Sequence, residues 1–220
     1  MKKILLLIFT LLLSYSCEIQ YDGETRIVVQ GQLIDRNNNP LSDKKITITT
    51  YSDDTYGGSD LISYANTDAE GRFTLVFPAP KSEEIFIQTS INEHQNNGLQ
   101  SKIINALKKN FNNYKLDLKQ VVLYETKDIS QLDILLNKVS TNKQITNIHI
   151  EGLQAGYFTD LTTEINQNQL LTTRFDVIKN QTINLSYTLV DYTDPIKTVT
   201  TNQKAVIEIN SENVIHTITY

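Results

Sequence analysis

The chain has 220 residues, a formal net charge of −5 at pH 7, one cysteine and no tryptophan. An acidic surface repels nucleic acid and anionic lipid headgroups, so we expect no nucleic-acid partner and no electrostatic attachment to a membrane. Because a single cysteine cannot form an internal disulfide, stability must come from apolar cores, and a chain of this length can bury one or two of them.

The first 16 residues are predicted to be an export signal. Lys2 and Lys3 precede an apolar run over 4–13, and small and polar residues then lead to Cys17. The run is about half of the roughly 20 residues that a transmembrane helix needs. This segment resembles the lipobox of bacterial lipoproteins, with Ser16 as the small residue before the cysteine. The resemblance implies that Cys17 becomes a lipidated N-terminus carrying fatty acids such as palmitate.

An alternative remains at this point, because Ser14 stands where a lipobox usually has an aliphatic residue. Ser14 and Ser16 also fit an ordinary signal-peptidase site, which would leave Cys17 unlipidated. Residues 17–25 are polar and acidic and are predicted to be a tether. They resemble the signals that send Bacteroidota-type lipoproteins to the cell exterior, which implies a cell-envelope location at the outer membrane.

Over 26–123, runs rich in β-branched residues alternate with turn residues, which predicts an all-β sandwich. Val29 and Leu33 fall on one face of the first run, and Ile46 and Ile48 on one face of the second. Turns are expected at 37–40 and 68–71, where Asn, Pro, Asp and Gly are concentrated.

Residues 99–111 differ from this pattern, because Leu99, Ile103, Leu107 and Phe111 recur every four residues. This spacing predicts one short amphipathic helix on a sheet or at its edge. The alternative is an irregular crossover.

A charged connector over 124–131 leads to a second predicted β-sandwich over 132–220. Seven strand-like runs in this region match the size and strand count of an immunoglobulin-like sandwich. In one of them, Ile183, Leu185, Tyr187 and Leu189 alternate with polar residues. The fold class is therefore all-β, with two tandem β-sandwiches.

Two motifs in the first domain resemble one known family. VVQGQLIDRNNNPLSDKKITI is similar to the opening of the carboxypeptidase regulatory-like domain, a transthyretin-like (prealbumin-like) sandwich, and NTDAEGRFTLVF is similar to a later strand-turn-strand segment of that family. The resemblance covers residues 26–123. The matching positions are Gly31, Asp35, Pro40, Leu41, Thr67, Asp68, Gly71, Phe73 and Leu75.

The resemblance implies structural roles rather than catalytic ones. Asp35, Pro40, Asp68 and Gly71 would shape turns, and Phe73 would fill the core. Asn38 stands where the family has glycine, and asparagine also adopts the left-handed region. Such domains are similar to modules attached to carboxypeptidases, outer-membrane receptors and envelope lipoproteins, which implies scaffolding or contact with a partner protein.

The sequence offers little for metal or nucleophilic chemistry. His94, His149 and His216 lack the spacing of a zinc site, and His149 with Glu151 is only a pair. We therefore expect no cofactor and no catalytic residue. The loop with Asp53, Asp54 and Asp60 is a weak calcium candidate without EF-hand spacing. Three tyrosines near this loop, Tyr51, Tyr56 and Tyr64, could form a sugar-stacking surface, but core or rim packing is the favoured explanation, because the chain has no tryptophan and tyrosine is common in ordinary strands.

These observations favour a non-catalytic, lipid-anchored envelope module that presents β-sandwiches for contact with a protein or ligand. Its partners would be the membrane, through the N-terminal lipid, and an envelope protein. The alternative function is a hydrolase, or an accessory subunit of an envelope enzyme or outer-membrane receptor.

Overall fold

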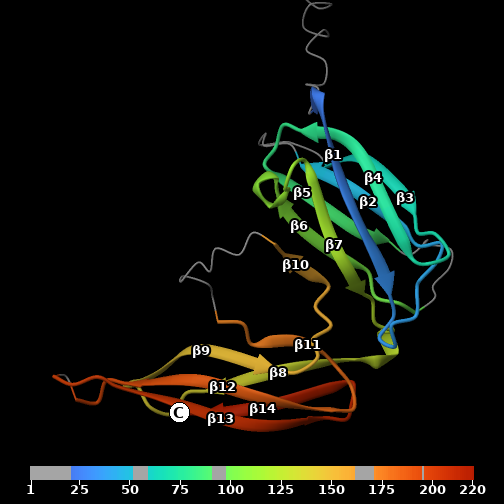
Figure 1. Ribbon diagram of the computed structural model, residues 1–220. Coiled ribbons are helices and arrows are strands. Elements are labelled where there is room, and N and C mark those ends of the chain that lie inside the picture. Colours follow the sequence, from blue (N-terminus) through green and yellow to red (C-terminus); the bar gives the residue numbers. More distant parts are fainter. Residues whose placement is uncertain (1–20, 52–58, 91–97, 162–170, 195) are drawn as a thin grey trace, which may run out of the picture.

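The computed structural model describes residues 21–51, 59–90, 98–161, 171–194 and 196–220. Almost all regular structure in these ranges is β-strand, arranged as two sandwiches that follow one another in the chain (Figure 1). The all-β architecture with two tandem sandwiches is therefore confirmed. Within the described ranges, no helix has the length and apolarity that crossing a membrane requires.

The first sandwich consists of a three-stranded and a five-stranded sheet. The smaller sheet has the order β4-β1-β7, with β1 antiparallel to β4 and parallel to β7. The larger sheet has the order β10-β6-β5-β2-β3. The strands of the smaller sheet are β1 (Tyr21–Ile34), β4 (Arg72–Pro80) and β7 (Lys115–Val122), and those of the larger are β2 (Lys45–Tyr51), β3 (Ser59–Asn66), β5 (Glu84–Ser90), β6 (Lys102–Leu107) and β10 (Phe158–Asp160).

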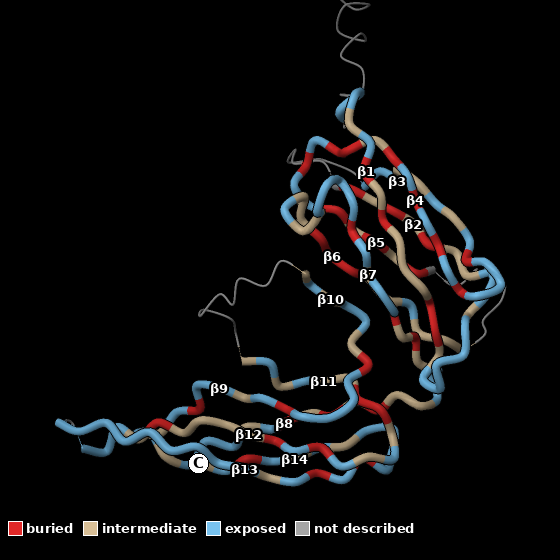
Figure 2. Tube along the Cα trace, in the orientation of Figure 1, coloured by how far each residue is buried: buried red, intermediate tan, exposed pale blue. Residues whose placement is uncertain are grey.

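The core of this sandwich comes from the period of two in its strands, which turns alternate side chains inward. Val29 and Leu33 of β1 face Ile46 and Ile48 of β2, and all four side chains have no solvent-accessible surface. Figure 2 shows the same alternation of buried and exposed residues along the strands. The inward faces predicted from the sequence are the ones that the structure buries.

The second sandwich has two three-stranded sheets, in the orders β11-β8-β14 and β13-β12-β9. Its separate core includes Leu132, Ile183, Leu185 and Ile209. The strands are β8 (Ile129–Asn137), β9 (Lys143–Glu151), β11 (Arg174–Ile178), β12 (Gln181–Asp191), β13 (Val199–Ile209) and β14 (Asn213–Thr219). Two of the seven strand-like runs of the sequence, TVTT and KAVIEI, belong to one continuous strand, β13.

A segment after β9 connects the two sandwiches. The chain over 152–161, here called the crossing segment, leaves the second sandwich and adds β10 to the edge of β6 in the first. The Ile103 amide donates to the Tyr157 carbonyl at 2.7 Å, and the Leu161 amide donates to the Asn105 carbonyl at 2.9 Å. Leu161 also packs against the first core. The larger sheet of the first sandwich is thus completed by a strand from the second half of the chain.

The helix predicted over 99–111 is wrong. Residues 102–107 form β6, which pairs with β5 on one side and β10 on the other, and only Lys108–Asn110 make a single 3-10 turn. Two adjacent β-branched residues, Ile103 and Ile104, favour the strand.

Two predicted boundaries also shift. The structure places residues 21–25 in β1 rather than in the tether. The predicted connector contains a 3-10 turn at Thr126–Asp128, and β8 has already begun at Ile129.

Candidate functional site

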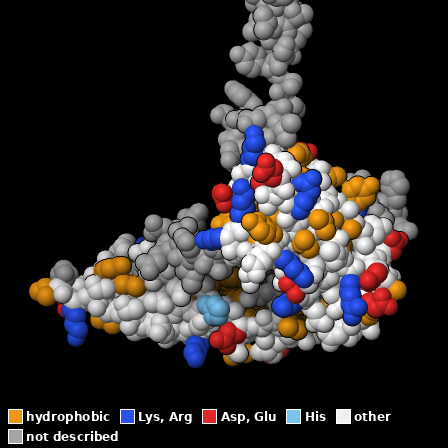
Figure 3. Space-filling view, turned by 45° about the horizontal axis from the view of Figure 1, so that its top comes forward, with side chains coloured by type: hydrophobic (Ala, Val, Ile, Leu, Met, Phe, Trp, Pro, Cys, Tyr) orange, Lys and Arg blue, Asp and Glu red, His pale blue; other side chains and the backbone are white. Residues whose placement is uncertain are grey.

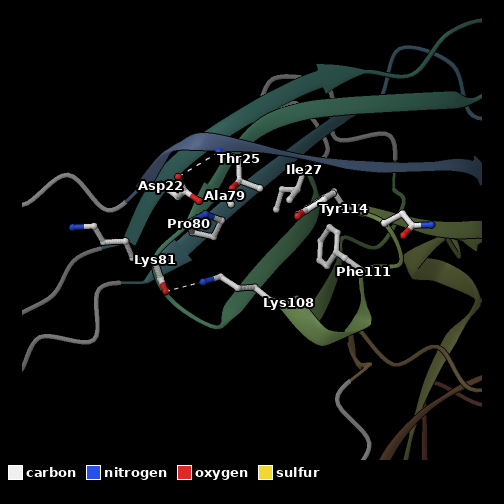
Figure 4. A pocket seen from close by; sticks show the side chains of 10 residues that line it. Asp22, Thr25, Ile27, Ala79, Pro80, Lys81, Lys108, Phe111 and Tyr114 are labelled. Atoms are coloured by element: carbon white, nitrogen blue, oxygen red, sulfur yellow. Dashed lines mark hydrogen bonds between the residues drawn. The ribbon is translucent and has the colours of Figure 1, made fainter.

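A cleft of about 700 Å³ lies where β1 enters the first sandwich. Figure 1 shows this entry point at the end of the first sandwich away from the second. The start of β1 supplies one wall, the end of β4 and Lys81 supply another, and the turn after β6 supplies the third (Figure 4). This volume lies within the range of about 300 to 1,000 Å³ that is typical of small-molecule sites.

The wall from β1 carries a carboxylate that is fixed by local hydrogen bonds. Asp22 accepts the Thr25 hydroxyl at 2.6 Å and the Glu24 amide at 2.8 Å. These contacts occupy the place where the pairing of β1 with β4 shifts register, between Tyr21 and Arg26. The Thr25 hydroxyl, the backbone amides and, to a smaller extent, the Lys108 charge lower the pKa of Asp22. Asp22 is therefore an anion at neutral pH.

A lysine is fixed on the opposite wall. Lys108 Nζ donates to the Lys81 carbonyl oxygen at 2.9 Å, as Figure 4 shows. The same ammonium lies 3.6 Å from Glu83 Oε1. Lys81 also lines the cleft, and the charge of Lys108 acts on Asp22 across it.

The remaining surface of the cleft is mainly apolar, apart from Asn113, and ends in an exposed aromatic ring. Ile27 and Ala79 are buried, and Phe111 lies beside them, whereas Tyr114 is 65% exposed at the rim. An apolar surface between charged walls suits a small amphipathic ligand better than a fully hydrated ion.

The rim tyrosine has an unusual backbone. Asn113 and Tyr114 have φ values of 48° and 65° and form the two-residue connection between Asn112 and Lys115, which pair with each other. Such turns normally place glycine at the second position, because a side chain there costs free energy. The Tyr114 carbonyl accepts the Val28 amide at 2.8 Å, which fixes the turn against β1. The sequence signal, NNYK, resembles an asparagine-glycine hairpin turn with tyrosine in place of the glycine.

The residues of the family resemblance lie elsewhere, in two turns that pack together. Asp35 accepts the Asn37 and Asn39 amides at 2.7 and 2.8 Å, and Asp68 accepts the Glu70 and Arg72 amides at 3.0 and 2.7 Å. The two turns contact each other through the backbone, because the Leu33 amide donates to the Gly71 carbonyl at 2.8 Å.

Gly31 and Phe73 form a cross-strand pair within the same sandwich. They are register partners on β1 and β4, and Phe73 is 5% exposed. A Cβ at Gly31 would lie 3.0 Å from Cζ of the Phe73 ring, so the absence of a side chain makes room for the aromatic ring. Pro40, whose Cα is close to Gly71, belongs to the contact between turns rather than to the cleft.

Among the residues that the structure describes, the candidate metal ligands do not form a cluster. Asp60 accepts a hydrogen bond from the Tyr21 hydroxyl, which raises the pKa of Tyr21 to about 12, while Asp53 and Asp54 lie outside the described ranges. Across those ranges no cluster of three or more ligating side chains occurs. His149 and Glu151 are exposed on β9, and His216 is half-buried on β14.

Of the predicted tyrosine surface, the structure describes the exposure of Tyr64. Tyr64 is 64% exposed, with Lys45 Nζ 5.1 Å from its ring centroid. Cys17, Tyr56 and His94 lie outside the described residues.

No protein-family model and no curated protein matches the chain. Among solved structures, the Bacillus anthracis TIE protein is 16% identical over 89% of this chain and 34% of that one, with a TM-score of 0.34. Shaft pilin SpaA from Lactobacillus rhamnosus GG is 10% identical over 89% and 98% of the chains, with a TM-score of 0.32. A 3-chlorocatechol 1,2-dioxygenase from Rhodococcus opacus 1CP is 13% identical over 49% and 62%, with a TM-score of 0.36. The chain thus spans about a third of the TIE protein.

Proposed function

We propose that this protein is a non-catalytic, lipid-anchored module of the bacterial cell envelope, attached to the outer membrane through Cys17. Its β-sandwiches contact a small amphipathic ligand or another envelope protein. The first sandwich is of the carboxypeptidase regulatory-like type, and the matched turn residues Asp35, Asp68 and Gly71 support this assignment because each acts on the backbone of a turn.

The anchor proposal rests on the position of the only cysteine. Cys17 follows an apolar run with two lysines before it, which is the layout of an export signal. Two or more acyl chains give a protein stable membrane attachment, whereas an acidic surface gives none. Only Glu18 to Gln20 lie between Cys17 and β1, and an extended chain spans at most about 3.6 Å per residue. The cleft at the start of β1 would therefore lie close to the lipid surface.

The contact proposal rests on Tyr114. A tyrosine in left-handed backbone, at a turn position where glycine is favoured, costs stability, and the turn places its exposed ring at the rim of the cleft. Costs of this kind concentrate at functional surfaces. This observation favours a binding surface at the cleft.

The anchor is tested by changing Cys17→Ala and following incorporation of a fatty-acid analogue together with membrane fractionation. The variant should lose the label and move to the soluble fraction, because the acyl chains supply nearly all of the membrane affinity. Ser16→Ala, which keeps a small residue before the cysteine, should retain both label and membrane. A wild-type protein that takes up no label would disprove the lipoprotein proposal.

A further inference from the structure

A second cavity lies at the open seam of the first sandwich. It has a volume of about 270 Å³ and lies where β7, the edge of the smaller sheet, faces β6 and β10 at the edge of the larger one. Lys102 and Ile104 of β6 and Leu118 of β7 line it, and the crossing segment adds Thr159 and Leu161. We call it the seam cavity. It shares no lining residue with the cleft beside β1.

Lys102 stands where the strand pattern calls for an apolar residue. Along β6 its side chain belongs to the same face as Ile104 and Ala106, which are 4% and 0% exposed. The backbone is held in place because the Lys102 amide donates to the Thr89 hydroxyl at 2.9 Å. A lysine on the inward face of a central strand is costly to retain without a partner for its charge.

The described residues offer the Lys102 ammonium no such partner. No carboxylate lines the seam cavity within the described ranges, and burial lowers the pKa of Lys102. The polar side chains that line the cavity beside it are neutral: the Thr159 hydroxyl, the Tyr124 phenol and the Gln120 and Gln154 amides. These groups can donate to an anion, and among the described lining residues Tyr124 is the only other titratable group.

We propose that the seam cavity binds a small aliphatic monocarboxylate, with its carboxylate on Lys102 and its alkyl chain against Leu118 and Leu161. One cation balances one negative charge, which favours a monocarboxylate over a phosphate dianion in a protein of net charge −5. The mixed lining matches both ends of such a molecule, and the volume suits a ligand of a few carbon atoms. This site goes beyond the proposed function and does not depend on lipidation of Cys17.

The test is a titration of the purified full-length protein, labelled with 13C at lysine Cε, with hexanoate followed by NMR. The Lys102 signal is the one that disappears in the Lys102→Met variant. We expect this signal to shift saturably, with a Kd of about 1 mM, the order of magnitude that a ligand of this size reaches. Hexylammonium, which has the same chain and the opposite charge, should not shift it.

Matched variants make the result specific. For the variants, which lack the Lys102 signal, binding is followed on the hexanoate signals by saturation-transfer NMR. Lys102→Met should weaken hexanoate binding at least about tenfold, and Lys102→Gln supplies a neutral polar alternative if the methionine variant does not fold. Lys204→Met, at an exposed position on β13, should leave binding unchanged. The proposal is wrong if hexanoate leaves the Lys102 signal in place, if hexylammonium shifts it equally, or if the two Lys102 variants bind hexanoate as tightly as the wild type.

Discussion

At the scale of single residues, Gly71 ties the two turns of the first sandwich together. Its φ is +71°, and a Cβ at this position would lie 2.4 Å from the Leu33 carbonyl oxygen and 3.0 Å from the Leu41 amide nitrogen. Both neighbours are backbone atoms, which cannot rotate away. The turn and its glycine could be predicted from the sequence, because Asp68 and Gly71 have the spacing of a turn. The close approach of the Leu33 backbone could not, because it depends on a contact between distant parts of the chain.

Changing Gly71→Ala should lower the free energy of unfolding by at least about 2 kcal/mol, from left-handed strain of about 1 to 2 kcal/mol together with the backbone clash. Chemical denaturation measures the effect. Gly98→Ala has a similar φ of +68° and no contact closer than 3.9 Å, so it should show the strain alone, about 1 kcal/mol. Gly23→Ala meets no atom within 4 Å and should change stability by less than about 0.5 kcal/mol. Equal losses at Gly71 and Gly98 would argue against the clash.

At the scale of elements, β6 shows why one prediction failed. Its inward face holds Lys102, Ile104 and the small Ala106, so the apolar alternation that marks a strand is weak there. The helical spacing in the sequence instead joined Ile103 and Leu107 of β6 with residues that lie outside the strand on either side, Leu99 and Phe111. A lysine at position 102, which the proposed binding site requires, interrupts the apolar alternation by which a strand is recognised in the sequence.

The strand β10 was missed for a different reason. It has three residues, and its pairing partner β6 lies more than 50 residues earlier in the chain. A segment this short has no measurable period, and parallel pairing leaves no turn signal between the strands. By contrast, the long alternating runs of β1 and β12 could be predicted because each has one face against a core.

The crossing segment should stabilise the first sandwich. Leu161→Ala removes a side chain that packs against the first core, and we expect a loss of about 1 to 2 kcal/mol, since the leucine is only partly buried. Hydrogen exchange of the Ile103 amide, which donates to Tyr157 of this segment, should become faster. Leu153→Ala, at a position 55% exposed, is the matched control and should leave this amide protected. Unchanged exchange in Leu161→Ala would mean that β10 does not support β6.

At the scale of the whole molecule, several aspartates in both sandwiches have a pKa below the usual value of 3.8. The lowered pKa values arise first from hydrogen bonds: the Asn39 side chain acts on Asp35, the Lys119 amide on Asp117, and the Arg174 side chain on Asp133. Similar contacts from Thr25 and Thr193 lower the pKa of Asp22 and Asp191. Asp22 and Asp117 are exposed and the other three are only partly buried, so each contribution is small, and the effect on stability comes from several acting together.

The folded protein should therefore lose stability in acid. A carboxyl whose pKa is lower in the folded state stabilises the fold above its unfolded pKa, and this contribution disappears as the pH falls through the folded pKa. The free energy of unfolding, measured by urea denaturation, should thus decrease as the pH falls below about 4. Because hydrogen bonds are the main cause at most of these sites, added salt should change this dependence little.

Asp35→Asn gives the sharpest form of this last prediction. Asparagine keeps an oxygen that can accept the Asn37 and Asn39 amides but cannot ionise. The variant should be less stable than the wild type at neutral pH, and the difference should shrink below about pH 4, where Asp35 of the wild type becomes protonated. Asn39→Ala, which removes the largest cause of the lowered pKa, should flatten the acid dependence in the same direction. A difference between wild type and Asp35→Asn that stays constant from pH 7 to pH 3 would show that the charge of Asp35 contributes nothing to folding.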